Sequence, residues 1–306
     1  MNTIIPDIET LKTVVKINAA IPYESIVCFI DDAQEIYILP QIGDKTLILS
    51  AEDGILKNKI LRALGPLTLM LATPELGISY GDNGITVDNQ QGKRSPANEA
   101  KIEAAKENLL FRGMQALDRL LKHLSDNSEL YPDYIEYQEK ITGNSPCIIS
   151  NAQAFQDDGM VNIDYSTVTF RTMLPTLRQL QERQLREMLP EELLTRLLAN
   201  NKLSAKENIL LSHCVRYVAN KCAELYTSQT GHDQRTATGT PEFKPIIRPV
   251  YQDSVETGNF FADQANYYAG KIQTYLNENA VDLGITIPDA TMNFNSKEKH
   301  LFTSIS

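Results

Sequence analysis

Several residue patterns that mark common protein classes are missing from this sequence. It has no tryptophan and only four histidines and four cysteines. Neither the histidines nor the cysteines have the close spacing of zinc ligands. The scattered cysteines are Cys28, Cys147, Cys214 and Cys222. We interpret them as reduced and mostly as small core residues. The adjacent His213 and Cys214 would point about 100° apart on a helix, so they cannot easily share a metal ion or a proton.

A long apolar run is also missing. Residues 64–74 form an uncharged run of eleven residues that stops at Pro74, whereas a membrane span needs about 20 apolar residues. The opening MNTIIPDIETLK has no basic region followed by an apolar block, so we expect neither a secretion signal nor a lipid anchor. The sequence thus predicts a soluble protein that is made in the cytoplasm.

Motifs of catalysis are scarce as well. We find no nucleophile elbow and no phosphate-binding loop, and the acid pairs at 31–32, 157–158 and 191–192 are neighbours that do not converge as catalytic carboxylates must. We therefore predict no enzyme, no catalytic, cofactor-binding or metal-binding residues and no cofactor. The alternative is an enzyme whose site is assembled from scattered residues, which would show a deep pocket with convergent polar groups.

Acidic residues outnumber basic ones. The chain has 39 Asp and Glu against 29 Lys and Arg, a formal net charge of -10. This charge would repel a phosphate backbone unless bases gather on one face. Arginines are denser from Arg171 to Arg196, and such a cluster could touch DNA or an acidic partner. They interleave with Glu182 and Glu187, which also fits a mixed surface of salt bridges.

The chain does contain internal sequence similarity. Three segments of the first half recur in the same order in the second half: residues 49–56 (LSAEDGIL) as 203–210 (LSAKENIL), Leu39–Pro40 as Leu189–Pro190, and 120–127 as 271–279. Such colinear matches favour a duplicated unit over two unrelated helical stretches. In both copies the serine of the LSA motif precedes an acid by three residues, as in a capping box, so a helix should start at Ser50 and at Ser204.

In the first copy, the capped helix should kink at Pro66, and Pro74 should push Thr73 out of helical geometry. Gly43 should end an earlier helix with a positive φ. The following segment alternates apolar and polar residues around a D-N-G turn, which predicts a β-hairpin at about 77–88. A long amphipathic helix is expected at about 97–127. In the capped helix and in this one, the apolar residues that should face the core recur at helical spacing: Ile60, Leu61, Leu64, Leu67 and Leu71 in the first, and Ile102, Leu109, Leu110, Leu117, Leu120, Leu121 and Leu124 in the second.

In the second copy, residues 160–173 alternate as one or two strands do, and residues 175–188 read as a helix. The segment 227–252 predicts a longer hairpin or loop, and 252–279 predicts the last long helix. Residues 281–306 have no helical period and read as an extended arm, suited to packing on a neighbouring subunit by strand addition.

These expectations give a mainly α fold with two tandem copies of a helical bundle unit, each with a β-hairpin before its long last helix. The predicted domains are a first helical repeat at 1–149, a second at 150–280 and the C-terminal arm at 281–306. Tyr131, Tyr134 and Tyr137 recur in the linker between the copies. They fit either a partner interface or a linker that packs on its own domain.

The order of these elements resembles a known family. Three segments and the closing residues carry the resemblance: KINAAIPYESIVCFIDDAQEIYILPQIG (16–43), ATPELGISYGDNGITV (72–87), ANEAKIEAAKENLLFRGMQALDRLLKHL (97–124) and NFNSKEKHLFTSIS (293–306). The sequence resembles the duplicated helical head-to-tail connector, or adaptor, proteins of tailed bacteriophages and prophages.

The resemblance implies a structural virion protein, made in the bacterial cytoplasm, that forms a ring of commonly twelve copies beneath the portal protein. The ring would continue the DNA channel towards the tail and let genomic DNA pass without sequence recognition. Expected partners are other copies of the chain, the portal protein, and tail or further connector proteins, with no membrane. The alternative is a helical scaffold or regulator that binds another protein or DNA through the Arg171–Arg196 region.

Overall fold

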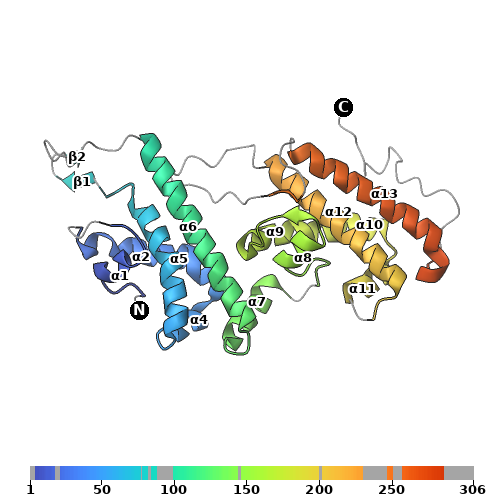
Figure 1. Ribbon diagram of the computed structural model, residues 1–306, viewed down its shortest axis with the longest axis horizontal. Coiled ribbons are helices and arrows are strands. Elements are labelled where there is room, and N and C mark those ends of the chain that lie inside the picture. Colours follow the sequence, from blue (N-terminus) through green and yellow to red (C-terminus); the bar gives the residue numbers. More distant parts are fainter. Residues whose placement is uncertain are drawn as a thin grey trace. The chain divides into compact units, whose positions relative to one another are not determined.

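The computed structural model confirms the mainly helical fold (Figure 1). It describes residues 4–17, 21–76, 78–81, 84–87, 99–143, 146–199, 202–229, 247–250 and 257–285. The chain forms two compact units, which exchange short segments. The first unit consists of Met1–Ser145, Ile163–Leu174 and Gln229–Ile246, and the second of Pro146–Asn162, Pro175–Ser228 and Ile247–Ser306. None of the helices in the described ranges is long and apolar enough to cross a membrane.

The first unit begins with short helices and ends with long ones. Its elements are α1 (Ile8–Lys12), the 3₁₀ turn η1 (Tyr23–Ser25), α2 (Val27–Ala33), the π-helical turn η2 (Gln34–Ile38), α3 (Leu39–Ile42), α4 (Asp44–Leu49), α5 (Gly54–Ala72), β1 (Ile78–Gly81), β2 (Gly84–Val87), α6 (Glu99–Asp126) and α7 (Pro132–Thr142). It also takes in the start of α9 (Thr167–Leu180).

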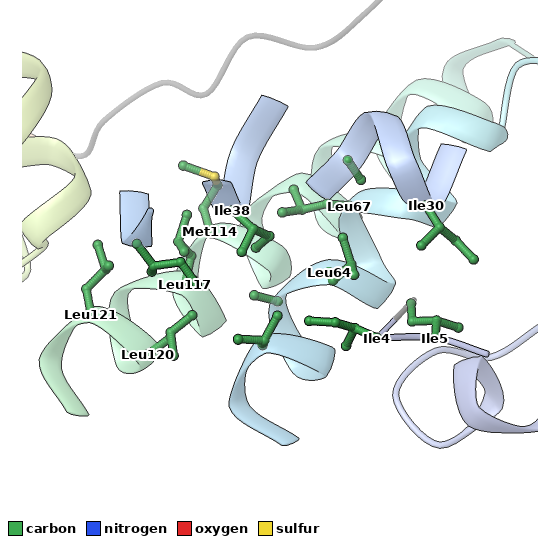
Figure 2. Close-up of a cluster of buried hydrophobic side chains, with 14 of the residues drawn as sticks. Ile4, Ile5, Ile30, Ile38, Leu64, Leu67, Met114, Leu117, Leu120 and Leu121 are labelled. Atoms are coloured by element: carbon green, nitrogen blue, oxygen red, sulfur yellow. The ribbon is translucent and has the colours of Figure 1, made fainter. Parts of the chain in front are cut away.

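Helices α5 and α6 run antiparallel, side by side, through this unit (Figure 1). Their facing sides supply much of its apolar core, and Figure 2 shows Leu64 and Leu67 of α5 in one buried cluster with Leu117 and Leu120 of α6. These four leucines expose at most 1% of their surface. The helical spacing of apolar residues therefore predicted the buried faces of both helices correctly.

A glycine lets the two helices approach closely. A Cβ atom built on Gly113 of α6 would lie 2.6 Å from Cγ of Leu67 and 3.4 Å from the carbonyl oxygen of Ala63. Real Cβ atoms do not approach this closely, so any side chain at position 113 would push α6 away from α5.

Two local predictions for α5 need correction. The helix starts at Asp53, whose carboxylate accepts from the backbone N–H groups of Ile55 and Leu56, while the Ser50 hydroxyl donates to Leu47 O at the end of α4. A carboxylate one residue from the first turn outcompetes a more distant hydroxyl. The helix includes Pro66 and ends at Ala72, and the kink predicted at Pro66 stays a prediction.

The end of α5 differs from expectation in one further way. Thr73 keeps helical backbone angles (φ -53°, ψ -41°), and its hydroxyl donates to Leu69 O. Pro74 therefore does not force Thr73 into an extended conformation, because the side chain bond back to the helix favours one more helical residue. Gly43 does end α3 with a positive φ of 76°, as predicted.

The first hairpin is confirmed. Strands β1 and β2 pair antiparallel, with Ile78 opposite Val87 and Gly81 opposite Gly84. The hairpin lies between α5 and α6 in the chain, where the D-N-G pattern placed it (Figure 1).

The second unit contains α8 (Ala152–Asp157), β3 (Val161–Asn162), the remainder of α9, the π-helical turn η3 (Gln181–Leu185), α10 (Arg186–Met188), α11 (Glu191–Ala199), α12 (Ala205–Gln229), β4 (Arg248–Pro249) and α13 (Thr257–Leu283). Helices α12 and α13 contact through aromatic rings. The ring of His213 lies 5.8 Å from that of Tyr275, and Arg216 lies over the ring of Tyr268.

Strand predictions in this unit were mostly wrong. Only Val161–Asn162 of the segment 160–173 is a strand, and it pairs antiparallel with Arg248–Pro249. Helix α9 begins at Thr167, earlier than the predicted start at residue 175. Ser166 caps it, because its hydroxyl oxygen accepts from the N–H of Thr169 at 3.0 Å.

The capping box of the second copy is confirmed. Ser204 N–H donates to a Glu207 carboxylate oxygen at 2.9 Å, and Glu207 N–H donates to Ser204 Oγ at 3.2 Å. Asn279 has non-helical backbone angles (φ -121°, ψ 22°), so the last long helix kinks where its end was predicted, and a further helical turn runs to Leu283. Leu283 is buried and its carbonyl accepts from Arg196, so the predicted arm at 281–306 begins too early. Residues 286–306, and 230–246 of the predicted second hairpin, lie outside the described residues.

The order of elements recurs in the two halves of the chain. A helix leads into a π-helical turn (η2, η3), followed by a short helix (α4, α11), a long helix (α5, α12) and a second long helix (α6, α13). The predicted residue pairing does not follow this order. Leu39–Pro40 opens α3 directly after η2, whereas Leu189–Pro190 separates α10 from α11, the place that Gly43 takes in the first half. Duplication itself stays a prediction.

The close contact at Gly113 gives a stability prediction. Replacement of Gly113 by Val should lower the free energy of unfolding by about 2 kcal/mol, because the side chain overlaps Leu67. Gly270 of α13 is the control: a Cβ there meets nothing within 4 Å, so Gly270→Ala should stabilise by up to about 1 kcal/mol. Urea denaturation followed by circular dichroism measures both, and an unchanged midpoint for the Val variant would contradict the close packing.

Candidate functional site

A groove on the first unit carries a concentration of positive charge. Its volume is about 780 Å³. It is lined by Thr13, Val14, Gly54, Ile55, Asn58, Lys59, Arg62, Pro66, Arg112, Gln115, Ala116 and Arg119. Four of these residues are basic and none is acidic, although the whole chain has a net charge of -10. We call this feature the basic groove.

The two antiparallel helices supply the four bases. Lys59 and Arg62 are three residues apart on α5, and Arg112 and Arg119 are seven residues apart on α6. Both spacings place side chains on one face of a helix. The close packing of α5 on α6 therefore brings two separate pairs of bases to one groove.

The positive charge of the groove is not neutralised within the described part of the chain. None of its four bases forms a salt bridge with a described acid. Arg62 donates to Asn58 Oδ1 at 3.0 Å and Arg112 to the carbonyl oxygen of Val14 at 3.1 Å, and both acceptors are neutral. These bonds hold the guanidinium groups in place and leave their charge available to an anion.

An apolar side chain lies beside these charges. Ile55, in the first turn of α5, exposes 64% of its surface at the edge of the groove. Val14, Pro66 and Ala116 add further apolar lining. Cationic groups around apolar surface suit an anionic ligand that also has an apolar part.

A hydrogen-bonded cluster fixes the start of α5, where Gly54 and Ile55 line the groove. The Asp53 carboxylate accepts from two backbone N–H groups and from the Tyr131 hydroxyl at 2.7 Å. Because Tyr131 donates its proton to Asp53, His123 Nε2 donates to the Tyr131 oxygen at 3.3 Å. The cluster thus ties α5 to α6 and to the residue before α7.

The protonation of this cluster follows from its surroundings. The backbone N–H of Leu56, followed by the Tyr131 hydroxyl, lowers the pKa of Asp53. Burial and the Asp53 charge raise the pKa of Tyr131 to about 12. Burial, and then the charge of Lys59, lower the pKa of His123. At neutral pH the cluster therefore holds an ionised Asp53 with a neutral Tyr131 and His123.

A second polar cluster holds the start of α9 on the first unit. Asp118 of α6 accepts from the Ser166 hydroxyl at 2.7 Å and from Val168 N–H at 2.9 Å. Burial raises the pKa of Asp118, while the Val168 and Ser166 hydrogen bonds oppose the rise. Arg171 donates to Gln41 and to the Tyr134 hydroxyl, the latter at 3.0 Å.

The arginine-rich region matches a mixed surface of internal contacts. Arg186 forms salt bridges with Glu182 and Glu191, and Arg196 forms one with Glu207. With Arg171 bound to Gln41, three arginines of this region are engaged within the chain. The adjacent acid pairs at 31–32, 157–158 and 191–192 are exposed.

The linker tyrosines pack on their own domain. Tyr131 and Tyr134 are buried, and the Tyr137 ring lies against Gly43, where its hydroxyl donates to the Pro40 carbonyl oxygen at 3.2 Å. Of the two alternatives for these residues, the structure supports the second. Tyr131 lies directly before helix α7, and Tyr134 and Tyr137 lie within it.

The adjacent His213 and Cys214 have different surroundings. The His213 ring faces tyrosines of α13, while Cys214 is fully buried, and burial raises the pKa of its thiol. Cys222 is also buried, whereas Cys28 is exposed, so the core prediction is right for two of the four cysteines. No group of three or more His, Cys, Asp or Glu side chains in the described ranges could hold a metal ion.

The four bases of the groove were not singled out from the sequence. A signal was present: residues 54–72 contain Lys57, Lys59 and Arg62 without any acid, and residues 108–117 contain Arg112 without any acid. Each stretch alone is an ordinary helix surface. Only the packing of α5 against α6 brings the bases to one place.

Comparison with known proteins relates part of the chain to a protein family. Residues 32–143, just over a third of the chain, match a family of unknown function, DUF6712. The matched part runs from the end of α2 to the end of α7, and so includes the hairpin and most of the basic groove. No curated protein and no solved structure matches.

The Asp53 cap gives a pH prediction. The pKa of Asp53 is lowered in the fold, so its stabilising effect is present above its unfolded pKa, about 3.9, and is lost as the pH falls through the folded value. Asp53→Ala should lower the free energy of unfolding at pH 7 by about 1 kcal/mol.

Asp53→Asn is the matched control, because Asn also caps helices but does not titrate. It should stay close to the wild type at pH 7 and lose less stability than the wild type between pH 5 and pH 3, as measured by urea denaturation. Equal losses for the two proteins would contradict the role of the Asp53 charge.

Proposed function

We propose that this protein is a structural subunit of a tailed-bacteriophage particle, a head-to-tail connector or adaptor. In this proposal, copies of the chain form a ring, of twelve members as is common in the family it resembles, beneath the portal protein. The ring continues the DNA channel towards the tail.

The observation that carries the proposal is the pair of packed antiparallel helices α5 and α6 with the β1–β2 hairpin between them. Segments of this region supply the resemblance to connector proteins, and the recurring order of elements in the second half agrees with a duplicated connector. A rigid helical pair supports a ring wall, and a hairpin at its end gives a contact to a neighbouring protein.

The charge of the chain is consistent with this role. A net charge of -10 disfavours general attachment to the phosphate backbone, which suits a channel that DNA must slide through. Identical subunits close into a ring when two different faces of each subunit meet head to tail. The partners in this proposal are other copies of the chain, the portal protein, and tail or further connector proteins, and the site of action is the head-tail junction of the virion.

Assembly on the portal protein tests the proposal. The chain is co-purified with the portal protein of the same phage and imaged by negative-stain electron microscopy. We expect an added ring coaxial with the portal, with the symmetry of a connector. A chain that neither binds its portal nor occurs in purified particles would overturn the proposal.

The C-terminal residues give a second prediction. Removal of residues 286–306 should leave the thermal midpoint unchanged and abolish ring assembly on the portal. Removal of 281–306 is the contrasting variant: it also deletes buried Leu283 and the Asp282 partner of Lys206, so it should lower the midpoint by several degrees. Normal assembly by the shorter deletion would show that the arm takes no part in ring contacts.

A further inference from the structure

We propose that the basic groove binds a second copy of this chain, through an acidic ridge formed by Asp31, Asp32, Glu35 and Ile36. This inference rests on the proposed ring and names the subunit contact that closes it. Two different surfaces of the first unit meet, so that each subunit offers its ridge to one neighbour and its groove to the other.

The acidic ridge lies on α2 and η2. Its four residues are exposed, and Ile36 exposes 56% of its surface. Asp31 and Glu35 are four residues apart, as are Asp32 and Ile36, so the four side chains share one side of the helical segment. In the described part of the chain, none of the three acids forms a salt bridge with a base.

Charge and polarity of the two surfaces are complementary. The groove offers four unneutralised bases, and the ridge offers three unneutralised carboxylates. Exposed Ile55 at the groove and exposed Ile36 on the ridge supply one apolar contact from each side. The bases of the groove repel one another, and so do the acids of the ridge. Pairing of the ridge with the groove reduces both repulsions and fixes how the two subunits align at the contact.

Size and composition favour a helical segment over nucleic acid. A groove of about 780 Å³ has the volume of a pocket that encloses part of a ligand, and it can take the side chains from one or two turns of a helix. A phosphate backbone makes no use of the apolar lining from Val14, Ile55 and Pro66. The apolar part of the groove is matched by Ile36 of the ridge.

Charge reversal of one surface at a time tests the contact. The groove variant carries Arg62→Glu and Arg119→Glu, and the ridge variant carries Asp31→Lys and Asp32→Lys. All four side chains are exposed, so both variants should fold. Sedimentation velocity and mass photometry of the wild type, across concentrations up to the highest that stays in solution, give the dissociation constant for self-association. Each variant alone should raise this dissociation constant at least tenfold.

One mixture and one combined variant make the test specific. The groove variant keeps its ridge and the ridge variant keeps its groove. Their two reversed surfaces are also complementary to each other, so an equimolar mixture should regain association with the two variants in alternation. A chain that carries all four substitutions has both charges exchanged and should regain self-association. Arg183→Glu and Glu139→Lys, exposed and outside both surfaces, are the matched controls and should behave as the wild type.

Other outcomes overturn the inference. It fails if the wild type stays monomeric over the whole range, if the fourfold variant does not regain association, or if the controls lose it equally. Duplex DNA binding that is lost in the groove variant and kept in the ridge variant, without a change in self-association, would assign the groove to nucleic acid. Normal rings of the groove variant on the portal would refute this contact alone, whereas ridge-to-groove association without portal binding would refute only the connector.

Discussion

Helix α6 lies so close to α5 that the space for a side chain at position 113 is taken up by Leu67. The contact determines more than the local packing. It sets the separation of Lys59 and Arg62 on one helix from Arg112 and Arg119 on the other, and hence the width of the basic groove. It also buries the leucines that the two helices share. Because Gly113 has no side chain, the two helices pack closely, and this packing determines both the apolar core of the first unit and the spacing of the bases on its surface.

Periodicity alone predicted the elements that depend on burial. The apolar stripes of α5 and α6 and the alternation around Gly81 to Gly84 were read correctly, because each follows from residues a few positions apart. Helix ends were less predictable. Both LSA motifs look alike, yet Ser204 caps a helix while Ser50 ends one, since Asp53 offers a closer acceptor to the N–H groups of α5.

Features that depend on contacts between distant residues could not be predicted. Asp118 reads as an ordinary acid on a long helix, but it receives hydrogen bonds from the beginning of a helix about fifty residues further on. The two π-helical turns have no local sequence pattern that distinguishes them from α-helix. The basic groove is likewise invisible in a linear reading, because each helix contributes only half of its charge.

The hydrogen bonds from Ser166 and Val168 to Asp118 have a consequence for biosynthesis. Residues 163–174 belong to the first compact unit, although residues 146–162, which precede them, belong to the second. When only the first 145 residues have left the ribosome, the first unit therefore still lacks residues 163–174. The part-buried carboxylate of Asp118 gains its donors only when the start of α9 emerges from the exit tunnel, so the first unit is completed only after residues 146–162 of the second unit have emerged.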